Sequence, residues 1–285
     1  MMKIIFKISI LVVVLWCTAC DIVEKPYIEL SDDNCGNADG PVPIRQIVVE
    51  KYTGHKCGNC PEGDEKMHEL IDRYCDHVIP VSIHAGYFAQ PDPTGKYSYD
   101  YTTTEGDELD EYFGSSNAGL PNAIVNRTEY DGKQILSPFE WAAAVEDFLH
   151  QPPDADIHIT AGVPEGSRKL SAEVQVTFLK EFAENIRLTV YLLEDSIMTW
   201  QKDYTADPPD IKDYTHNHVL RAALNSTWGE LLTNTADKGD VMSKNFEYRV
   251  PEHIQIEYCQ IVAFISKDSS DEIIQAASEE VYYND

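Results

Sequence analysis

Two cysteines, Cys57 and Cys60, separate an apolar strand from an amphipathic helix, and this arrangement limits the fold more than any other feature of the chain. The apolar run within residues 46–52 is typical of a buried strand. Pro61 suits the first turn of a helix, and apolar side chains then recur at helical spacing in Met67, Leu70, Ile71 and Tyr74. We therefore predict a strand, a pair of cysteines and a helix in direct succession.

The segments that follow continue an alternation of strands and helices. Residues 78–84 and 122–126 read as buried strands, and residues 137–150 begin with an N-cap serine and a proline, which predicts a last helix. Between the two strands lies an insertion, residues 85–118, that is rich in Tyr and Asp and contains a predicted helix over 105–113. This part of the chain therefore predicts an α/β domain.

Tandem prolines at residues 152 and 153 stop the last helix, and the period of the hydrophobic pattern changes beyond them. Apolar residues now alternate at period two, in segments near residues 157–159, 170–178, 186–193, 218–224, 246–250, 256–265 and 272–282. About seven short strands separated by turns favour an all-β sandwich of immunoglobulin-like architecture. The predicted domains are residues 45–151, with the insertion 85–118, and residues 154–285.

The first residues predict export. A basic start is followed by an apolar run of nine residues, Ile8 to Trp16, which matches a secretory signal and is shorter than the ~20 residues of a membrane-spanning helix. Cys17-Thr18-Ala19-Cys20 is typical of a lipoprotein-processing box, so we expect residues 1–19 to be removed and Cys20 to carry lipid. An ordinary signal peptide with a chance cysteine is the alternative. Residues 20–44 are polar, lack periodicity and predict a flexible tether.

The charge of the chain excludes one class of partner. The sequence has 22 Lys and Arg against 49 Asp and Glu, a formal net charge of -27. This surface repels polyanions, so nucleic acid is not expected as a partner. Export exposes the remaining cysteines to an oxidising compartment. Cys35 and Cys75 are candidates for a second disulfide, whereas Cys259 lies in an apolar segment and is expected to be a core residue.

The two spaced cysteines favour redox chemistry over a metal site. No second Cys-x-x-Cys or His pair follows with zinc-ligand spacing, and no cofactor motif is present. Cys57 is expected at the N-terminus of a helix, where the dipole stabilises a thiolate, with Lys56 and His55 adding positive charge. We therefore predict that Cys57 is the exposed nucleophile and that Cys60 is the resolving thiol.

A second feature lies before the strand at residues 122–126. Gly119-Leu120-Pro121 stands where thioredoxin-like proteins, which this part of the chain resembles, have a cis-proline facing the cysteines. The resemblance implies that Pro121 holds a cis bond and leaves the backbone of Leu120 to pair with a substrate strand, the alternative being a trans proline in a turn. Thioredoxins also bury an acid beneath the second cysteine for proton transfer, and the resemblance makes Glu50 the candidate for it. An ordinary charge at a strand end is its alternative.

These motifs carry a resemblance to known families. Residues 45–150 resemble the thioredoxin-like superfamily, although Lys56 and Asn59 stand where active thioredoxins usually have Trp and Pro. The chain from residue 20 to 285 is similar to the 28-kilodalton outer-membrane protein family of bacterial lipoproteins, on the strength of residues 50–61, 119–122, 216–221 and 274–277. The resemblance implies an outer-membrane location and an α/β thioredoxin-like domain followed by the immunoglobulin-like sandwich.

Two functions follow from this sequence. The first is a thiol-disulfide oxidoreductase acting on exported proteins through Cys57, Cys60 and Pro121, with Lys56, His55, Glu50 and Leu120 in support and without a metal or cofactor. The second is a surface-binding, adhesin-like or receptor-like lipoprotein whose Cys57 to Cys60 bond is a structural disulfide. In either function the lipid on Cys20 attaches the chain to the membrane.

Overall fold

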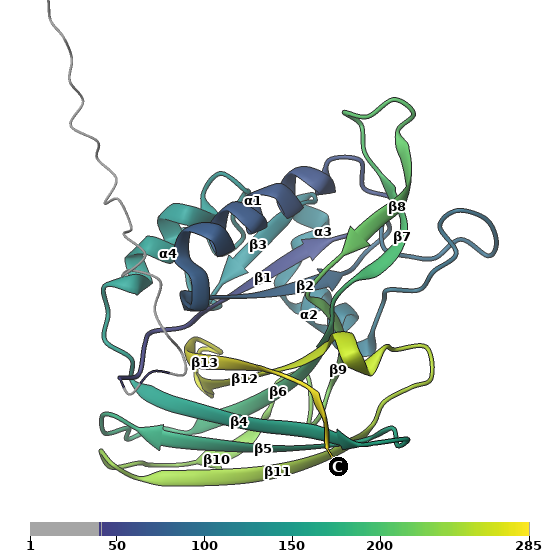
Figure 1. Cartoon of the computed structure of the whole chain (residues 1–285). Helices are drawn as coiled ribbons and strands as arrows, with labels where there is room; N and C mark the ends of the chain where they lie inside the picture. Colours follow the sequence, from purple (N-terminus) through teal and green to yellow (C-terminus); the bar gives the residue numbers. More distant parts are fainter. Residues whose placement is uncertain (1–39, 41, 285) are drawn as a thin grey trace, which may run out of the picture.

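The computed structural model describes residue 40 and residues 42–284, and the first half of this part of the chain mixes strands with helices (Figure 1). Its elements are, in chain order, β1 (Ile47–Thr53), α1 (Cys60–Tyr74), η2 (Cys75–His77), β2 (Val78–His84), α2 (Thr104–Phe113), α3 (Ser115–Ala118), β3 (Asn122–Val125) and α4 (Trp141–Leu149). The strand, helix and strand around the two cysteines thus form where the sequence predicts them.

The second half is built from strands, with one short 3-10 helix. Its elements are β4 (Ala155–Pro164), β5 (Lys169–Phe178), β6 (Ile186–Glu194), β7 (Ile197–Lys202), β8 (Asp210–His216), β9 (Val219–Ala223), β10 (Glu230–Thr233), β11 (Val241–Arg249), η3 (Ile256–Tyr258), β12 (Cys259–Lys267), β13 (Ile273–Glu280) and β14 (Tyr282–Asn284).

One mixed sheet runs through both halves of the chain. Its strand order is β13-β12-β6-β9-β2-β1-β3, with β10 paired to β6. The halves join where β9 lies parallel to β2, with Val219 opposite Ser82, and the N–H of Ser82 donates to the carbonyl oxygen of His218 at 2.7 Å. A second sheet has the order β11-β5-β4-β14, and β7 and β8 pair only with each other.

The sheets and helices stack in layers (Figure 1). In strands β1, β2, β6 and β12 nearly every residue is buried, so both faces of these strands are covered. Helices α1 and α4 cover one face of β1 and β3 through a core that includes Leu70 and Trp141. The other face of β1 and β2 packs on β6 and β12 through a core around Tyr52 and Phe264. A third core fills the space between β6, β12 and the second sheet.

The fold class predicted from the sequence, a thioredoxin-like α/β domain followed by an immunoglobulin-like sandwich, is wrong. The structure consists mostly of strands in mixed sheets, and β9 of the second half continues the sheet of β1, β2 and β3. The burial pattern explains the difference. In β6 and β12 nearly every residue is buried, whereas a sandwich strand leaves alternate residues in water. Both faces of these strands are covered, so the two halves share their cores.

Candidate functional site

The two spaced cysteines form a disulfide at the N-terminus of α1. Cys57 and Cys60 are bonded to each other, and their Cα atoms are 5.4 Å apart. Cys60 is the first residue of the helix and is fully buried, and Cys57 precedes the helix with 4% of its surface exposed. The sequence predicts an exposed Cys57, so its burial differs from expectation and requires a structural cause.

Leu120 and Pro121 lie on one side of this disulfide. The bond between them is cis, as the sequence predicts, and the carbonyl oxygen of Leu120 is 3.7 Å from Sγ of Cys57. Pro121 packs directly on the first turns of α1, because a Cβ added at Gly63 would lie only 2.8 Å from Cβ of Pro121. The loop before β3 and the start of α1 therefore hold each other in place beside the sulfur atoms.

A hairpin formed by β7 and β8 covers the cysteine loop on another side. The N–H of Lys202 donates to the carbonyl oxygen of His55 at 2.8 Å, and the N–H of Tyr204 donates to that of Gly58 at 2.9 Å. The buried amide of Gln201 donates to the carbonyl oxygen of Cys57 at 2.9 Å. This hairpin was not predicted from the sequence. The available signal was the pair Pro208 and Pro209, which marks the tip of the hairpin.

The two supporting cationic residues do not add a free positive charge to the site. Nζ of Lys56 pairs with the carboxylate of Asp92 at 3.0 Å and lies over the ring of Tyr87, so its charge is partly compensated. His55 is 1% exposed, and burial lowers its pKa to about 4. Its imidazole is therefore neutral near pH 7, and the N-terminus of α1 is the main feature that favours a thiolate at Cys57.

Glu50 lies on the face of β1 opposite to α1. Its two carboxylate oxygens accept from Nε and Nη2 of Arg127 at 2.9 and 2.7 Å, and both side chains are buried. Arg127 also donates to the hydroxyl of Tyr191 at 3.1 Å. Side chains alternate between the faces of a strand, and Val48 and Tyr52 share this face with Glu50. The carboxylate is therefore committed to Arg127 on the side of the sheet away from Cys60.

A second buried charge, which the sequence analysis did not single out, lies on the face of β1 that packs against α1. Lys51 is 4% exposed and forms an ion pair with Asp64 of α1. The same carboxylate accepts from the hydroxyl of Tyr214 in β8 at 2.6 Å, and Lys51 helps to lower the pKa of Asp64 although burial opposes this shift. A lysine within an apolar strand was the available signal. This chain of contacts ties strand, helix and hairpin together.

Three histidines and a tyrosine fill the space between the hairpin and the sheet. The ring of His84 stacks on Tyr101 with centroids 4.3 Å apart, His216 lies 5.6 Å from His84, and His55 lies 5.4 Å from Tyr101. Burial is the main cause that lowers the pKa of each histidine, to about 4 for His216. His84 is 4% exposed inside this histidine cluster.

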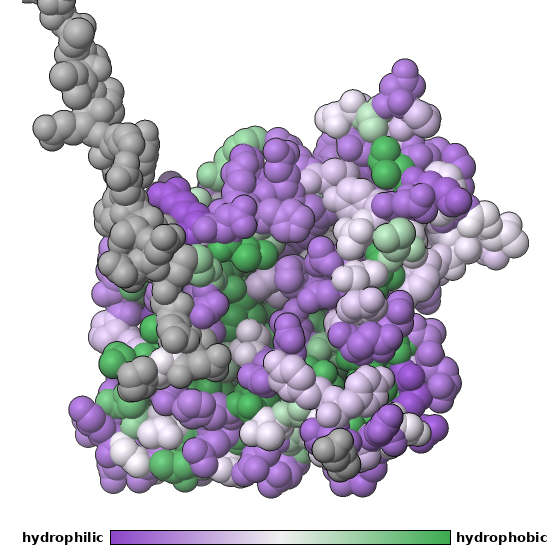
Figure 2. Space-filling view, in the orientation of Figure 1, coloured by the Kyte–Doolittle hydropathy of each residue, from purple (hydrophilic) through white to green (hydrophobic). Residues whose placement is uncertain are grey.

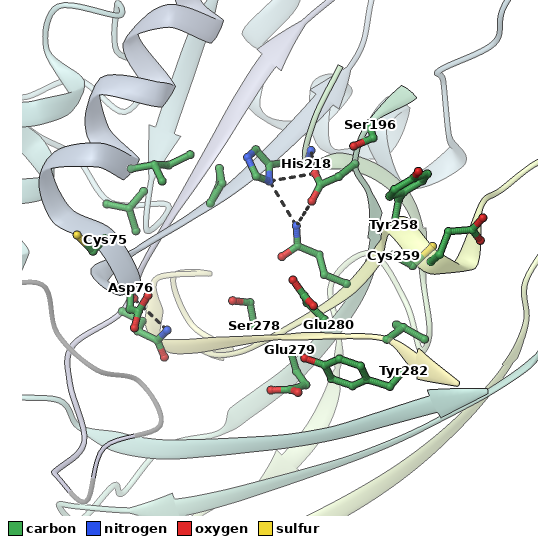
Figure 3. A pocket seen from close by; sticks show the side chains of 18 of the residues that line it. Cys75, Asp76, Ser196, His218, Tyr258, Cys259, Ser278, Glu279, Glu280 and Tyr282 are labelled. Atoms are coloured by element: carbon green, nitrogen blue, oxygen red, sulfur yellow. Dashed lines mark hydrogen bonds and ion pairs between the residues drawn. The ribbon is translucent and has the colours of Figure 1, made fainter. Parts of the chain in front are cut away.

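A cavity of about 920 Å³ lies away from the cysteines (Figure 3). It is a groove between the end of α1 and strands β12 and β13, and on the face shown in Figure 2 hydrophobic side chains are visible below α1. On one wall, Nδ1 of His218 lies 3.2 Å from the carboxylate of Asp195, and Gln260 contacts both side chains. Acidic side chains line it, so it favours cationic over anionic occupants.

Several features predicted from the sequence lie outside the described residues. The signal segment 1–19, the lipid-bearing Cys20, Cys35 and nearly all of the tether fall outside the part that the structure describes. Cys75 takes part in a disulfide, and Cys259 is a buried free thiol whose pKa burial raises to about 12.

Within residues 42–284 no group of three or more His, Cys, Asp or Glu side chains is arranged to hold a metal. No helix of this part combines the length and apolarity that crossing a bilayer requires.

A solved structure shares this fold over most of the chain. HBP35 of Porphyromonas gingivalis is similar with a TM-score of 0.59 at 19% sequence identity, and the match covers 84% of this chain and 76% of that chain. A domain of the outer membrane lipoprotein Omp28 from Porphyromonas gingivalis is 21% identical over 46% of this chain and 92% of that chain, with a TM-score of 0.30. No curated protein matches the chain.

The family follows from the sequence. The family model described as outer membrane protein Omp28 matches residues 106–284, more than half of the chain. The chain belongs to the Omp28 family of outer membrane proteins, which confirms the resemblance stated above. Its location is the outer membrane.

Proposed function

We propose that this outer-membrane protein is a thiol-disulfide oxidoreductase of exported proteins, held at the membrane by lipid on Cys20. The observation that carries the proposal is the position of Cys57: its sulfur lies before the N-terminus of α1 and 3.7 Å from the carbonyl oxygen of Leu120. A helix N-terminus favours the thiolate, and the neighbouring backbone offers an edge for a bound peptide.

The reaction starts from the reduced pair. The thiolate of Cys57 attacks one sulfur of a substrate disulfide, which breaks that bond, forms a mixed disulfide and releases a substrate thiolate. The thiolate of Cys60 then attacks Sγ of Cys57, which closes the Cys57 to Cys60 bond and releases the second substrate thiolate. Two electrons pass to the substrate, whose thiolates take protons from water. A dithiol donor of the envelope returns the pair to the reduced state.

The more buried position of Cys60 supports this division of roles. Cys60 is fully buried within the first turn of α1, whereas Cys57 precedes the helix and borders the half-buried Leu120 and Pro121. A partner therefore reaches Cys57 first. Within the described chain the N–H of Leu120 makes no hydrogen bond, so a substrate backbone that reaches the site can accept from it.

A surface-binding lipoprotein with a structural disulfide is the second candidate, and the 4% exposure of Cys57 favours it. Equilibration of the intact protein with glutathione buffers separates the two functions. An oxidoreductase requires a reduction potential above about -300 mV, whereas structural disulfides of secreted proteins lie below that value. A potential below it would leave the binding function and overturn the redox proposal.

A further inference from the structure

The backbone of the β7 to β8 hairpin meets the cysteine loop in the manner of a bound peptide. The N–H groups of Lys202 and Tyr204, two residues apart, donate to the carbonyl oxygens of His55 and Gly58 at 2.8 and 2.9 Å. The two donors are spaced as in an extended strand, and the two acceptors lie three residues apart in the turn that carries Cys57. The segment 201–204 therefore occupies a position on the loop that an extended partner backbone can take.

The ring of Tyr204 also covers the cysteine loop. A Cβ added at Gly58 would lie 2.5 Å from ring atoms of Tyr204, so the ring rests directly on the residue that follows Cys57. Tyr204 is itself 64% exposed, so the ring contacts Gly58 while most of the surface of the residue stays in water. A large aromatic side chain in this half-exposed position explains why Gly58 and Cys57 are buried although they lie in a surface loop.

Side-chain contacts hold the hairpin, which does not pair with either of the larger sheets. Its two strands pair only with each other, and an isolated two-stranded hairpin has little stability of its own in water. Side chains hold it instead: Tyr214 donates to Asp64 of α1, and Asp210 accepts from Tyr97 at 2.6 Å. Displacing residues 201–204 breaks the pairing of Gln201 with Ile211 and of Lys202 with Asp210, whereas the contact of Tyr214 with Asp64 lies outside this segment and stays in place.

We propose that residues 201–204 select the partners of the dithiol, and that Tyr204 is a specificity-determining residue. Access to Cys57 requires displacement of this segment by a partner whose cysteine lies in an extended, flexible stretch of backbone with free N–H groups. Incompletely folded exported proteins offer such stretches, whereas a disulfide held inside a folded protein does not. This inference rests on the proposed oxidoreductase function.

The test compares Tyr204→Ala with wild type in the full chain, with Tyr112→Ala as a matched control because Tyr112 is 63% exposed and contacts Phe113, Trp228 and Asp271 instead of the cysteine loop. Two substrates are used with dithiothreitol as reductant: a short linear peptide dimer joined by one disulfide, and folded insulin. Wild type is expected to favour the peptide. Tyr204→Ala is expected to raise kcat/KM for insulin about tenfold, equivalent to about 1.4 kcal/mol, and for the peptide less than twofold.

The outcomes separate the two claims. An equal change for both substrates, or the same change in Tyr112→Ala, overturns the selectivity and leaves the oxidoreductase function intact. No turnover of either substrate in wild type or variant overturns the oxidoreductase function and the selectivity with it. A double-mutant cycle adds a readout that does not depend on turnover: Gly58→Ala displaces the ring, so it should accelerate disulfide reduction by dithiothreitol in wild type and not in Tyr204→Ala.

Discussion

Replacement of His84 by phenylalanine is expected to make the protein less sensitive to acid. Both ring nitrogens of His84 are buried without a hydrogen-bond partner, and its ring stacks on Tyr101. Phenylalanine keeps the stacked ring and removes the titrating nitrogens. Burial lowers the pKa of His84 well below 6.5, and the nearby basic groups of His216, His55, Lys51 and Arg221 lower it further.

The size of the effect follows from proton linkage. In the unfolded chain His84 binds a proton as the pH falls through about 6.5, while in the folded protein it stays neutral to a much lower pH. Between these values the unfolded state holds more protons, so the free energy of unfolding falls by up to about 1.4 kcal/mol for each pH unit of acidification. From pH 7.5 to 5.0 this amounts to about 2 kcal/mol for His84 alone. His55 and His216 add to this loss of unfolding free energy as the pH falls, because their pKa values in the folded protein are about 4.

Urea unfolding of the intact protein between pH 7.5 and 5.0, followed by tryptophan fluorescence, measures this effect. The stability of His84→Phe relative to wild type should be constant above pH 7 and should increase by about 2 kcal/mol at pH 5.0. The matched control is His158→Phe in β4, because the side chain of His158 is 65% exposed. Parallel loss of stability in wild type and His84→Phe would refute the assignment of acid sensitivity to the histidine cluster.

The buried pair of Glu50 and Arg127 yields the remaining predictions. Arg127→Met leaves the Glu50 carboxylate buried without its partner and should lower the free energy of unfolding by about 3–5 kcal/mol in urea titrations at pH 7. The double variant Glu50→Gln with Arg127→Met removes that charge and should recover at least half of the loss. A double variant no more stable than Arg127→Met would show that the ion pair is not the cause.

Local features of the dithiol region were predictable because they depend on neighbouring residues. The apolar run of β1, the proline at the start of α1 and the helical spacing of its apolar residues fix the elements around Cys57 and Cys60. The helix of the insertion and its end at Gly114, which adopts a positive φ of 75°, also follow from local sequence. The cis bond before Pro121 was inferred from its place before β3.

The shared sheet and the hairpin depend on contacts between distant residues. The junction of β9 with β2 is one parallel residue pair, Val219 opposite Ser82, and no periodicity in either segment reveals its partner. The face that Glu50 occupies depends on the register of β1, because a shift of one residue moves a side chain to the other face of the strand. The cover over Cys57 comes from residues more than 140 positions later in the chain.

Turnover by the intact protein with and without Cys57 tests the central claim most directly. With dithiothreitol as reductant and a disulfide-linked peptide as substrate, wild type should reduce the peptide faster than the uncatalysed reaction. Cys57→Ser should reduce it at the uncatalysed rate, and Cys60→Ser should accumulate a mixed disulfide at Cys57. Equal rates for wild type and Cys57→Ser would contradict the account and leave a membrane-anchored binding protein with a structural disulfide.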